Sequence, residues 1–277
     1  MNVWHRPLRR LFAAALLGST LFSAAASAAE STWDQIQATK QLRLGVAPGD
    51  PWYYKDPISG QWTGVGYKLG EKIAADLGVK LVPVETTYGN VAAAIQANQI
   101  DLLLVLDATA ERKKALAFPE APLLWYKQGV LVKDGIKADS WDDLNRPDVR
   151  IGVTLGSSTD RDLTQRLPKA QIQRFANTDE TVAAFMSKRI DGFAFYHPAL
   201  AIALSHIRTG NLIVPTPVVQ LSSSIGLRKE SDPRFLNYIN QEVIKLNASG
   251  EVQKTFSEYM TAKGLDAKTI PGVTQDQ

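Results

Sequence analysis

The sequence predicts an α/β fold in which short buried strands alternate with amphipathic helices. Residues 42–46 and 102–106 have the length and composition of strands. The second is a continuous apolar run, as expected for a strand covered on both faces of a parallel sheet. Between them, residues 67–77 place their large apolar side chains on one helical face, and Gly78 follows as a C-terminal stop. This alternation is typical of α/β domains.

The first half of the chain completes the pattern. Pro83 lies inside one expected strand, and proline cannot donate to a central ladder, so this strand should lie at an edge or an end of the sheet. The expected elements are strands at 42–46, 80–84 and 102–106 and helices at 67–77 and 91–97.

The second half repeats the order and then becomes helical. Ile100-Asp101 and Ile190-Asp191 each follow a helical segment and precede an apolar strand, which indicates two similar lobes. The elements expected here are strands at 130–133, 150–155 and 192–195 and helices at 180–187, 233–246 and 252–259.

The N-terminus carries an export signal. A basic segment, an apolar run at residues 11–22 and a small-residue segment ending in Ala28 form the three parts of a secretory signal. The apolar run is shorter than the roughly 20 residues that a membrane-spanning helix needs. We therefore expect residues 1–28 to be a signal peptide that is removed after Ala28.

Charge and cysteine content narrow the function classes. The chain has 31 basic and 28 acidic residues, and the signal carries three arginines and no acid, so the mature chain is balanced. Without a basic patch, nucleic-acid binding is not expected. The chain has no cysteine, which excludes lipid attachment, disulfides and thiolate metal sites. We expect a periplasmic protein with no direct membrane anchor, no metal and no cofactor.

A ligand site is expected where the strands end, because open parallel sheets bind ligands beyond their carboxyl ends. The segments after the strands supply aromatic rings, one arginine, hydroxyl groups and helix N-termini, which together suit a small ligand with a carboxylate. These segments are residues 47–54, 107–112, 156–160 and 196–198.

Each of these residues also has a purely structural interpretation. Ser157 and Ser158 could cap a helix, Arg112 could be a solvated first-turn residue, and Trp52 could belong to the core.

Several short segments, each unspecific alone, occur in a specific order: Leu42-Arg43-Leu44-Gly45-Val46, Pro51-Trp52-Tyr53-Tyr54 with Gly64, Ile73-Ala74-Ala75-Asp76-Leu77-Gly78, Ile100-Asp101, Thr109-Ala110-Glu111-Arg112 with Phe118, Val153-Thr154-Leu155-Gly156-Ser157-Ser158, and Arg189-Ile190-Asp191-Gly192. From about Ile36 to Tyr259, the chain resembles the family 3 extracellular solute-binding proteins of the polar amino-acid-binding type.

The resemblance implies the type II periplasmic binding protein fold, with two α/β lobes joined by two hinge strands. Carried over, lobe 1 takes residues 29–126 and 220–277, and lobe 2 takes 127–219. The chain would cross between the lobes near 124–129 and 218–222. A ligand that bridges the lobes would shift the protein towards a closed form.

The resemblance also implies roles for particular residues. In family members that bind amino acids, an arginine at the position of Arg112 clamps the α-carboxylate. Groups at Ser157 and Ser158 serve the same carboxylate, and an aromatic residue near Trp52 covers the side chain. The expected ligand-binding residues are Arg112, Asp107, Ser157, Ser158, Trp52, Tyr53, Tyr196 and Thr109.

Three positions depart from the family pattern. Tyr196 stands where an aspartate usually holds the α-ammonium, Asp107 stands where the family has serine or threonine, and an acidic pair after Gly64 is replaced by Gly66 and Lys68. Asp107 could take over the ammonium, the ligand could lack an amine, or Asp107 could pair with Arg112.

The resemblance predicts a monomeric binding protein that captures an amino acid or a related carboxylate for an inner-membrane ABC permease, without catalysis. One alternative is an enzyme on the same fold, because cyclohexadienyl dehydratases resemble this family. Such an enzyme needs a general acid in the cleft, for which Asp107 and His197 are the candidates. The other alternative is an accessory or sensory protein that docks on a receptor or redox enzyme.

Overall fold

The computed structural model describes residues 30–270 and 273–275. The expected signal peptide lies outside these residues. From Ser31 onward the chain forms one compact unit. None of the helices in the described ranges is long and apolar enough to cross a membrane.

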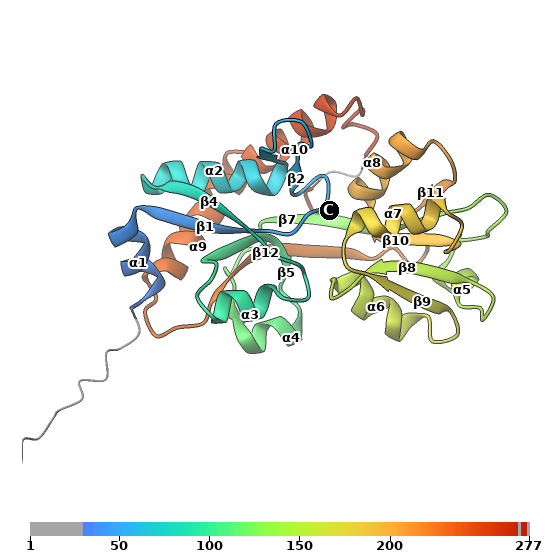
Figure 1. Cartoon of the computed structure of the whole chain (residues 1–277), viewed down its shortest axis with the longest axis horizontal. Helices are drawn as coiled ribbons and strands as arrows, with labels where there is room; N and C mark the ends of the chain where they lie inside the picture. Colours follow the sequence, from blue (N-terminus) through green and yellow to red (C-terminus); the bar gives the residue numbers. More distant parts are fainter. Residues whose placement is uncertain (1–29, 271–272, 276–277) are drawn as a thin grey trace, which may run out of the picture. The chain divides into compact units, whose positions relative to one another are not determined.

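We call the elements around β1, β4 and β5 the first lobe (Figure 1). The three strands are parallel, and β4 is the outermost, which confirms the edge position predicted from Pro83. A short antiparallel pair, β2 with β3, follows β1. The strands are β1 (Gln41–Val46), β2 (Tyr54–Lys55), β3 (Trp62–Thr63), β4 (Lys80–Glu85), β5 (Leu102–Asp107) and β6 (Leu116–Ala117), and the helices are α1 (Thr32–Thr39), α2 (Val65–Leu77), α3 (Val91–Gln96), α4 (Ala110–Ala115), α9 (Arg234–Ala248) and α10 (Glu251–Ala262).

We call the elements around β8, β9 and β10 the second lobe. In Figure 1 they lie on the opposite side from β1 and β4. Here β8 is parallel to both β9 and β10. The sequence pattern missed β9, β11 and α8. The strands are β8 (Arg150–Thr154), β9 (Gln171–Phe175), β10 (Gly192–Tyr196) and β11 (Asn211–Ile213), and the helices are α5 (Trp141–Leu144), α6 (Ser158–Arg166), α7 (Thr178–Met186) and α8 (His197–Ile207).

Two long strands are common to both lobes. They are β7 (Leu124–Val132) and β12 (Gln220–Arg228), which pair with each other in antiparallel fashion through residues 124–127 and 220–223. The later part of β7 pairs with β10 and β11, and the later part of β12 pairs with β5. Of β7, the apolar pattern predicted residues 130–133, and the family resemblance implied a crossing near 124–129.

An arginine–aspartate ion pair of the same kind joins two strands in each lobe. In the first lobe, the Asp101 carboxylate accepts the backbone N–H of Arg43 at 2.7 Å and its Nε–H at 3.1 Å. In the second lobe, Asp191 accepts the backbone N–H of Arg150 at 3.0 Å and its Nε–H at 2.8 Å. Arg150, and then Lys133, hold the pKa of Asp191 well below its usual range. The Ile-Asp pair that occurs twice in the sequence therefore corresponds to an arginine–aspartate ion pair that occurs once in each lobe.

The residue before each of these aspartates requires a glycine on the neighbouring strand. A Cβ on Gly45 would lie 2.7 Å from Cδ1 of Ile100, and a Cβ on Gly152 would lie 2.4 Å from Cδ1 of Ile190. Any larger residue would have to displace these buried isoleucines, so the two glycines allow each parallel pair to pack closely.

We expect Asp101→Ala to lower the free energy of unfolding by about 3 kcal/mol, because it leaves a largely buried arginine without its counter-ion. Asp101 is 1% exposed and Asp191 is 14% exposed, so Asp191→Ala should cost less, about 2 kcal/mol. Urea unfolding of both variants measures the difference. A loss below about 0.5 kcal/mol for Asp101→Ala would show that the Arg43–Asp101 ion pair does not stabilise the fold.

Candidate functional site

A buried carboxylate lies where the two lobes meet. Asp107 ends β5 and is 6% exposed. Its Oδ2 accepts hydrogen bonds from the hydroxyl groups of Tyr126 on β7 and Ser158 at the start of α6. Among the described residues, its Oδ1 has no hydrogen-bond partner. Asp107 therefore joins the lobes while keeping one oxygen for a further contact.

Arg112 lies beside this carboxylate and is 4% exposed. Its Nη1 donates to the backbone carbonyl of Asp107 at 3.1 Å, and its Nη2 donates to the carbonyl of Gly156 in the second lobe at 3.0 Å. Within the described part of the chain, no ion pair links its guanidinium to the Asp107 carboxylate. Two of the five guanidinium N–H groups are used in these bonds.

Aromatic rings from both lobes surround the carboxylate. Tyr196 lies edge to face with Tyr126 at a centroid distance of 4.4 Å and with Trp52 at 6.1 Å. Burial, and then the Asp107 carboxylate, raise the pKa of Tyr126 well above its usual value. Burial raises the pKa of Tyr88 to about 12. These phenols are therefore protonated at neutral pH and can donate hydrogen bonds.

The sequence analysis missed Tyr126 and Tyr88. Tyr126 lies in the segment 124–129 that was expected to cross between the lobes, so its position was a signal that we did not use. Tyr88 follows β4 just as Trp52 follows β1, and the rule that ligands bind beyond strand ends applies to it as well.

Several predicted site residues also make structural contacts. The Ser157 hydroxyl accepts the backbone N–H of Asp160 at 3.1 Å, and the Thr109 hydroxyl accepts that of Arg112 at 3.2 Å. Both are helix N-caps, as the structural interpretation of Ser157 expected. Trp52 and Tyr53 are fully buried, and the Tyr53 hydroxyl donates to the Leu104 carbonyl at 2.8 Å.

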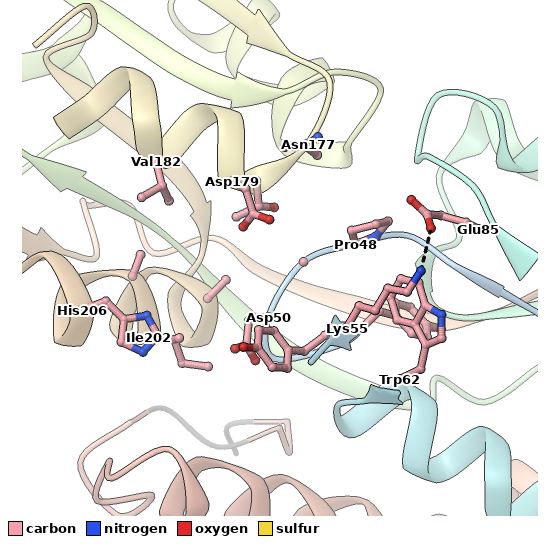
Figure 2. Close-up of a pocket in the computed structure, with 16 residues that line it drawn as sticks. Pro48, Asp50, Lys55, Trp62, Glu85, Asn177, Asp179, Val182, Ile202 and His206 are labelled. Carbon is pink, nitrogen blue, oxygen red and sulfur yellow. Dashed lines mark ion pairs between the residues drawn. The ribbon is translucent and has the colours of Figure 1, made fainter. Parts of the chain in front are cut away.

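The two lobes also enclose a separate space. It is a pocket of about 410 Å³ lined by residues of both lobes, and neither Asp107 nor Arg112 is among them. We call it the outer pocket (Figure 2). Tyr53, a predicted ligand-binding residue, lines this pocket. The other lining residues are Pro48, Gly49, Asp50, Tyr54, Lys55, Trp62, Glu85, Asn177, Thr178, Asp179, Val182, Ala199, Ile202, Ala203 and His206.

The acidic groups of the outer pocket differ in their partners. Asp50 binds Lys263 at 2.7 Å and the Tyr259 hydroxyl at 2.6 Å. Glu85 lies 3.9 Å from Lys55, the pair drawn with a dashed line in Figure 2. Asp179 is exposed in the first turn of α7.

The second candidate general acid, His197, begins α8. Burial, with a smaller effect of Lys127, lowers the pKa of His197 to about 4. Its imidazole is therefore neutral at neutral pH, which makes it a poor proton donor there.

Comparison with known proteins agrees with this two-lobe arrangement. A probable histidine-binding protein of Campylobacter jejuni is 26% identical over 160 residues, which cover 57% of this chain and 60% of that protein. A solved ancestral amino acid-binding protein, described as a precursor of cyclohexadienyl dehydratase, is 30% identical with a TM-score of 0.75, covering 83% of this chain and 99% of that one.

An amino acid ABC transporter substrate-binding protein of Streptococcus pneumoniae, solved with L-arginine bound, has a TM-score of 0.76 at 22% identity, covering 83% of this chain and 98% of that one. At this identity the likeness shows the fold alone. These structures confirm the predicted type II two-lobe fold.

Residues 42–262 match the family described as bacterial extracellular solute-binding proteins, family 3. The match spans most of the described chain and includes both lobes. The chain belongs to this family.

Proposed function

We propose that this protein is a periplasmic binding protein that captures a small amino acid between its lobes and delivers it to an ABC permease, without catalysis. The observation that supports this proposal most directly is the buried polar cluster at Asp107, to which both lobes contribute hydrogen bonds. Membership of the family and the expected export signal support the role and the location. A monomer is the expected state.

The ligand carboxylate is assigned to Arg112 and to the N-terminus of α6. Arg112 already spans both lobes through the Gly156 carbonyl, and a guanidinium binds carboxylates through paired N–H groups. Backbone N–H groups at a helix start add donors. Since the Ser157 hydroxyl caps the helix, its contribution comes through the backbone.

The ligand ammonium is assigned to Asp107. Its Oδ1 is buried and has no partner among the described residues, and a carboxylate in this setting favours a cation. Tyr196, at the usual position of the family aspartate, offers only a protonated phenol. The counter-charge is thus supplied by the first lobe instead of the second.

The lobes are proposed to be residues 29–126 with 220–277, and 127–219. The paired segments 124–127 and 220–223 would act as the hinge. Ligand binding would favour closure because it adds contacts to both sides of the cleft.

The enzymatic alternative has one specific argument in its favour, the likeness to a dehydratase precursor. Since His197 is neutral at neutral pH, Asp107 is the remaining candidate general acid, and its Oδ2 already accepts two hydrogen bonds. Purified protein should therefore show no turnover of prephenate or arogenate, and measurable turnover would replace binding with catalysis as its function.

A thermal-shift screen of refolded, ligand-stripped protein tests the proposal first. An amino acid at about a hundred times its dissociation constant should add roughly 2.7 kcal/mol of stability. If only deaminated analogues stabilise the protein, the ligand has no α-amine. If no amino acid or analogue does so, the proposed function is wrong.

We expect Arg112→Ala to weaken amino-acid binding by about 2–5 kcal/mol, because it removes one partner of a buried charged contact. Isothermal titration calorimetry measures the loss. Lys113→Ala is the matched control, since Lys113 is the exposed neighbour on the same helix, and it should bind like the wild type. Unchanged affinity in Arg112→Ala would exclude Arg112 as the clamp.

We expect Asp107→Ser to weaken binding of an amino acid and to tighten binding of its deaminated analogue, because the ammonium loses its counter-ion. Adding Tyr196→Asp should restore part of the amino-acid affinity by returning the carboxylate to the second lobe. Calorimetry on the single and double variants gives the coupling energy. The idea fails if Asp107→Ser keeps wild-type preference for the amine.

A further inference from the structure

An ion pair joins the two lobes at residues that have no assigned part in ligand binding. Glu111 lies in the first turn of α4 in the first lobe, and Arg161 lies on α6 in the second. The Nε–H of Arg161 donates to Glu111 Oε2 at 2.7 Å. We propose that this pair is a latch that stabilises the closed arrangement of the lobes directly, before any ligand is bound. The inference goes beyond the proposed function and rests only on its hinge.

The latch is connected to the polar cluster at Asp107 through one carbonyl group. The backbone oxygen of Gly156 accepts hydrogen bonds from Arg161 Nη1 at 2.9 Å and from Arg112 Nη2 at 3.0 Å. Arg112 belongs to the first lobe, whereas Arg161 belongs to the same lobe as Gly156. Arg161 is therefore a positioning residue, because it holds the acceptor of one interlobe hydrogen bond while it makes the interlobe ion pair.

The loop that carries this carbonyl is fixed within the second lobe. Asp160 is 6% exposed, and its carboxylate accepts the backbone N–H of Gly156 at 3.0 Å and the Nε–H of Arg174 at 2.8 Å. Since these bonds lie inside one lobe, opening the cleft leaves them intact. The loop and the start of α6 thus present a preformed surface to α4.

Other direct contacts between the lobes surround the latch. Gly156 has a φ of +73°, and a Cβ added there would lie 2.7 Å from Cα of Gly89 in the loop after β4, so the two backbones approach as closely as glycine allows. Next to Gly89, the buried ring of Tyr88 lies 6.5 Å from that of Phe195, edge to face. These contacts involve protein groups alone, so they favour closure without a ligand.

The ion pair is weak by itself but acts on an equilibrium that is sensitive to small effects. The side chains of Arg161 and Glu111 are 33% and 67% exposed, and a pair of this kind changes an equilibrium constant by about twofold to fivefold. The apparent dissociation constant depends on the fraction of protein in the binding-competent form. A latch therefore reduces the part of closure that the ligand itself must drive.

Distance measurements on refolded, ligand-stripped protein test the latch. The chain has no cysteine, so spin labels on Ala75→Cys in α2 and Gln165→Cys in α6, both exposed positions, report the separation of the lobes by double electron–electron resonance. A population should occur at the distance that this structure gives. Glu111→Gln should lower the closed-to-open ratio about twofold to fivefold. Salt at about 0.5 M should lower it in wild-type protein and have less effect in Glu111→Gln, because salt screens exposed charges.

Two further variants separate the ion pair from general effects of charge. Glu120→Gln is the matched control, because Glu120 is another exposed glutamate of the first lobe, and it should keep the wild-type ratio. Exchanging the charges, with Glu111→Arg and Arg161→Glu together, should recover part of the closed population that each single change removes. A double-mutant cycle on the four proteins gives the coupling between the two side chains.

The outcomes are distinct from those of the proposed function. The inference is overturned if ligand-free wild-type protein shows the open distance alone, or if Glu111→Gln and Glu120→Gln have equal ratios. It is also overturned if the exchanged pair recovers no closed population, because the two side chains then act independently. Failure of every amino acid in the thermal-shift screen overturns amino-acid capture instead and leaves these distances unchanged.

Discussion

The central constraint in this structure is a carboxylate buried where the lobes meet. An ionised carboxylate away from water is strongly unfavourable unless it is hydrogen bonded. Asp107 meets this requirement with one hydroxyl from β7 and one from α6, so its partners come from different parts of the chain. Burial, with the Asp107 carboxylate as a further cause, raises the pKa of the nearby Tyr126 phenol and keeps it protonated.

Two ion pairs place this carboxylate and its partners. Asp101 ties β5 to β1 in the first lobe, and Asp191 ties β10 to β8 in the second. In each case the aspartate lies just before its strand, so the far end of that strand carries a site residue, Asp107 in one lobe and Tyr196 in the other. An arginine–aspartate ion pair at the start of each strand thus helps to position the cleft residue at the end of that strand.

The cleft divides into regions of different chemistry. The inner cluster is buried, aromatic and rich in hydrogen-bond donors, and its one carboxylate keeps an oxygen without a partner among the described residues. The outer pocket has a volume of about 410 Å³, and its lining includes the carboxylates of Asp50, Glu85 and Asp179. Asp50 is paired with Lys263 and Glu85 lies near Lys55, whereas Asp179 is exposed in the first turn of α7.

The sequence by itself determined many of the elements and much of their order. Apolar runs located β1, β4, β5 and β10, Pro83 placed β4 at the edge, and the Ile-Asp echo indicated the two similar lobes. These features are local, because a strand or helix records its burial in the periodicity of its own residues.

Only the tertiary structure decided which side chains meet. Asp107 and Ser158 are 51 positions apart, and no local pattern records that Asp107 contacts Tyr126 and Ser158 while its carboxylate makes no ion pair with Arg112 in the described chain. The hydroxyls of Ser157 and Thr109 likewise cap helices because the backbone brings an N–H group within reach. Contacts across the cleft depend on how the two lobes face each other, and periodicity within one segment carries no information about that orientation.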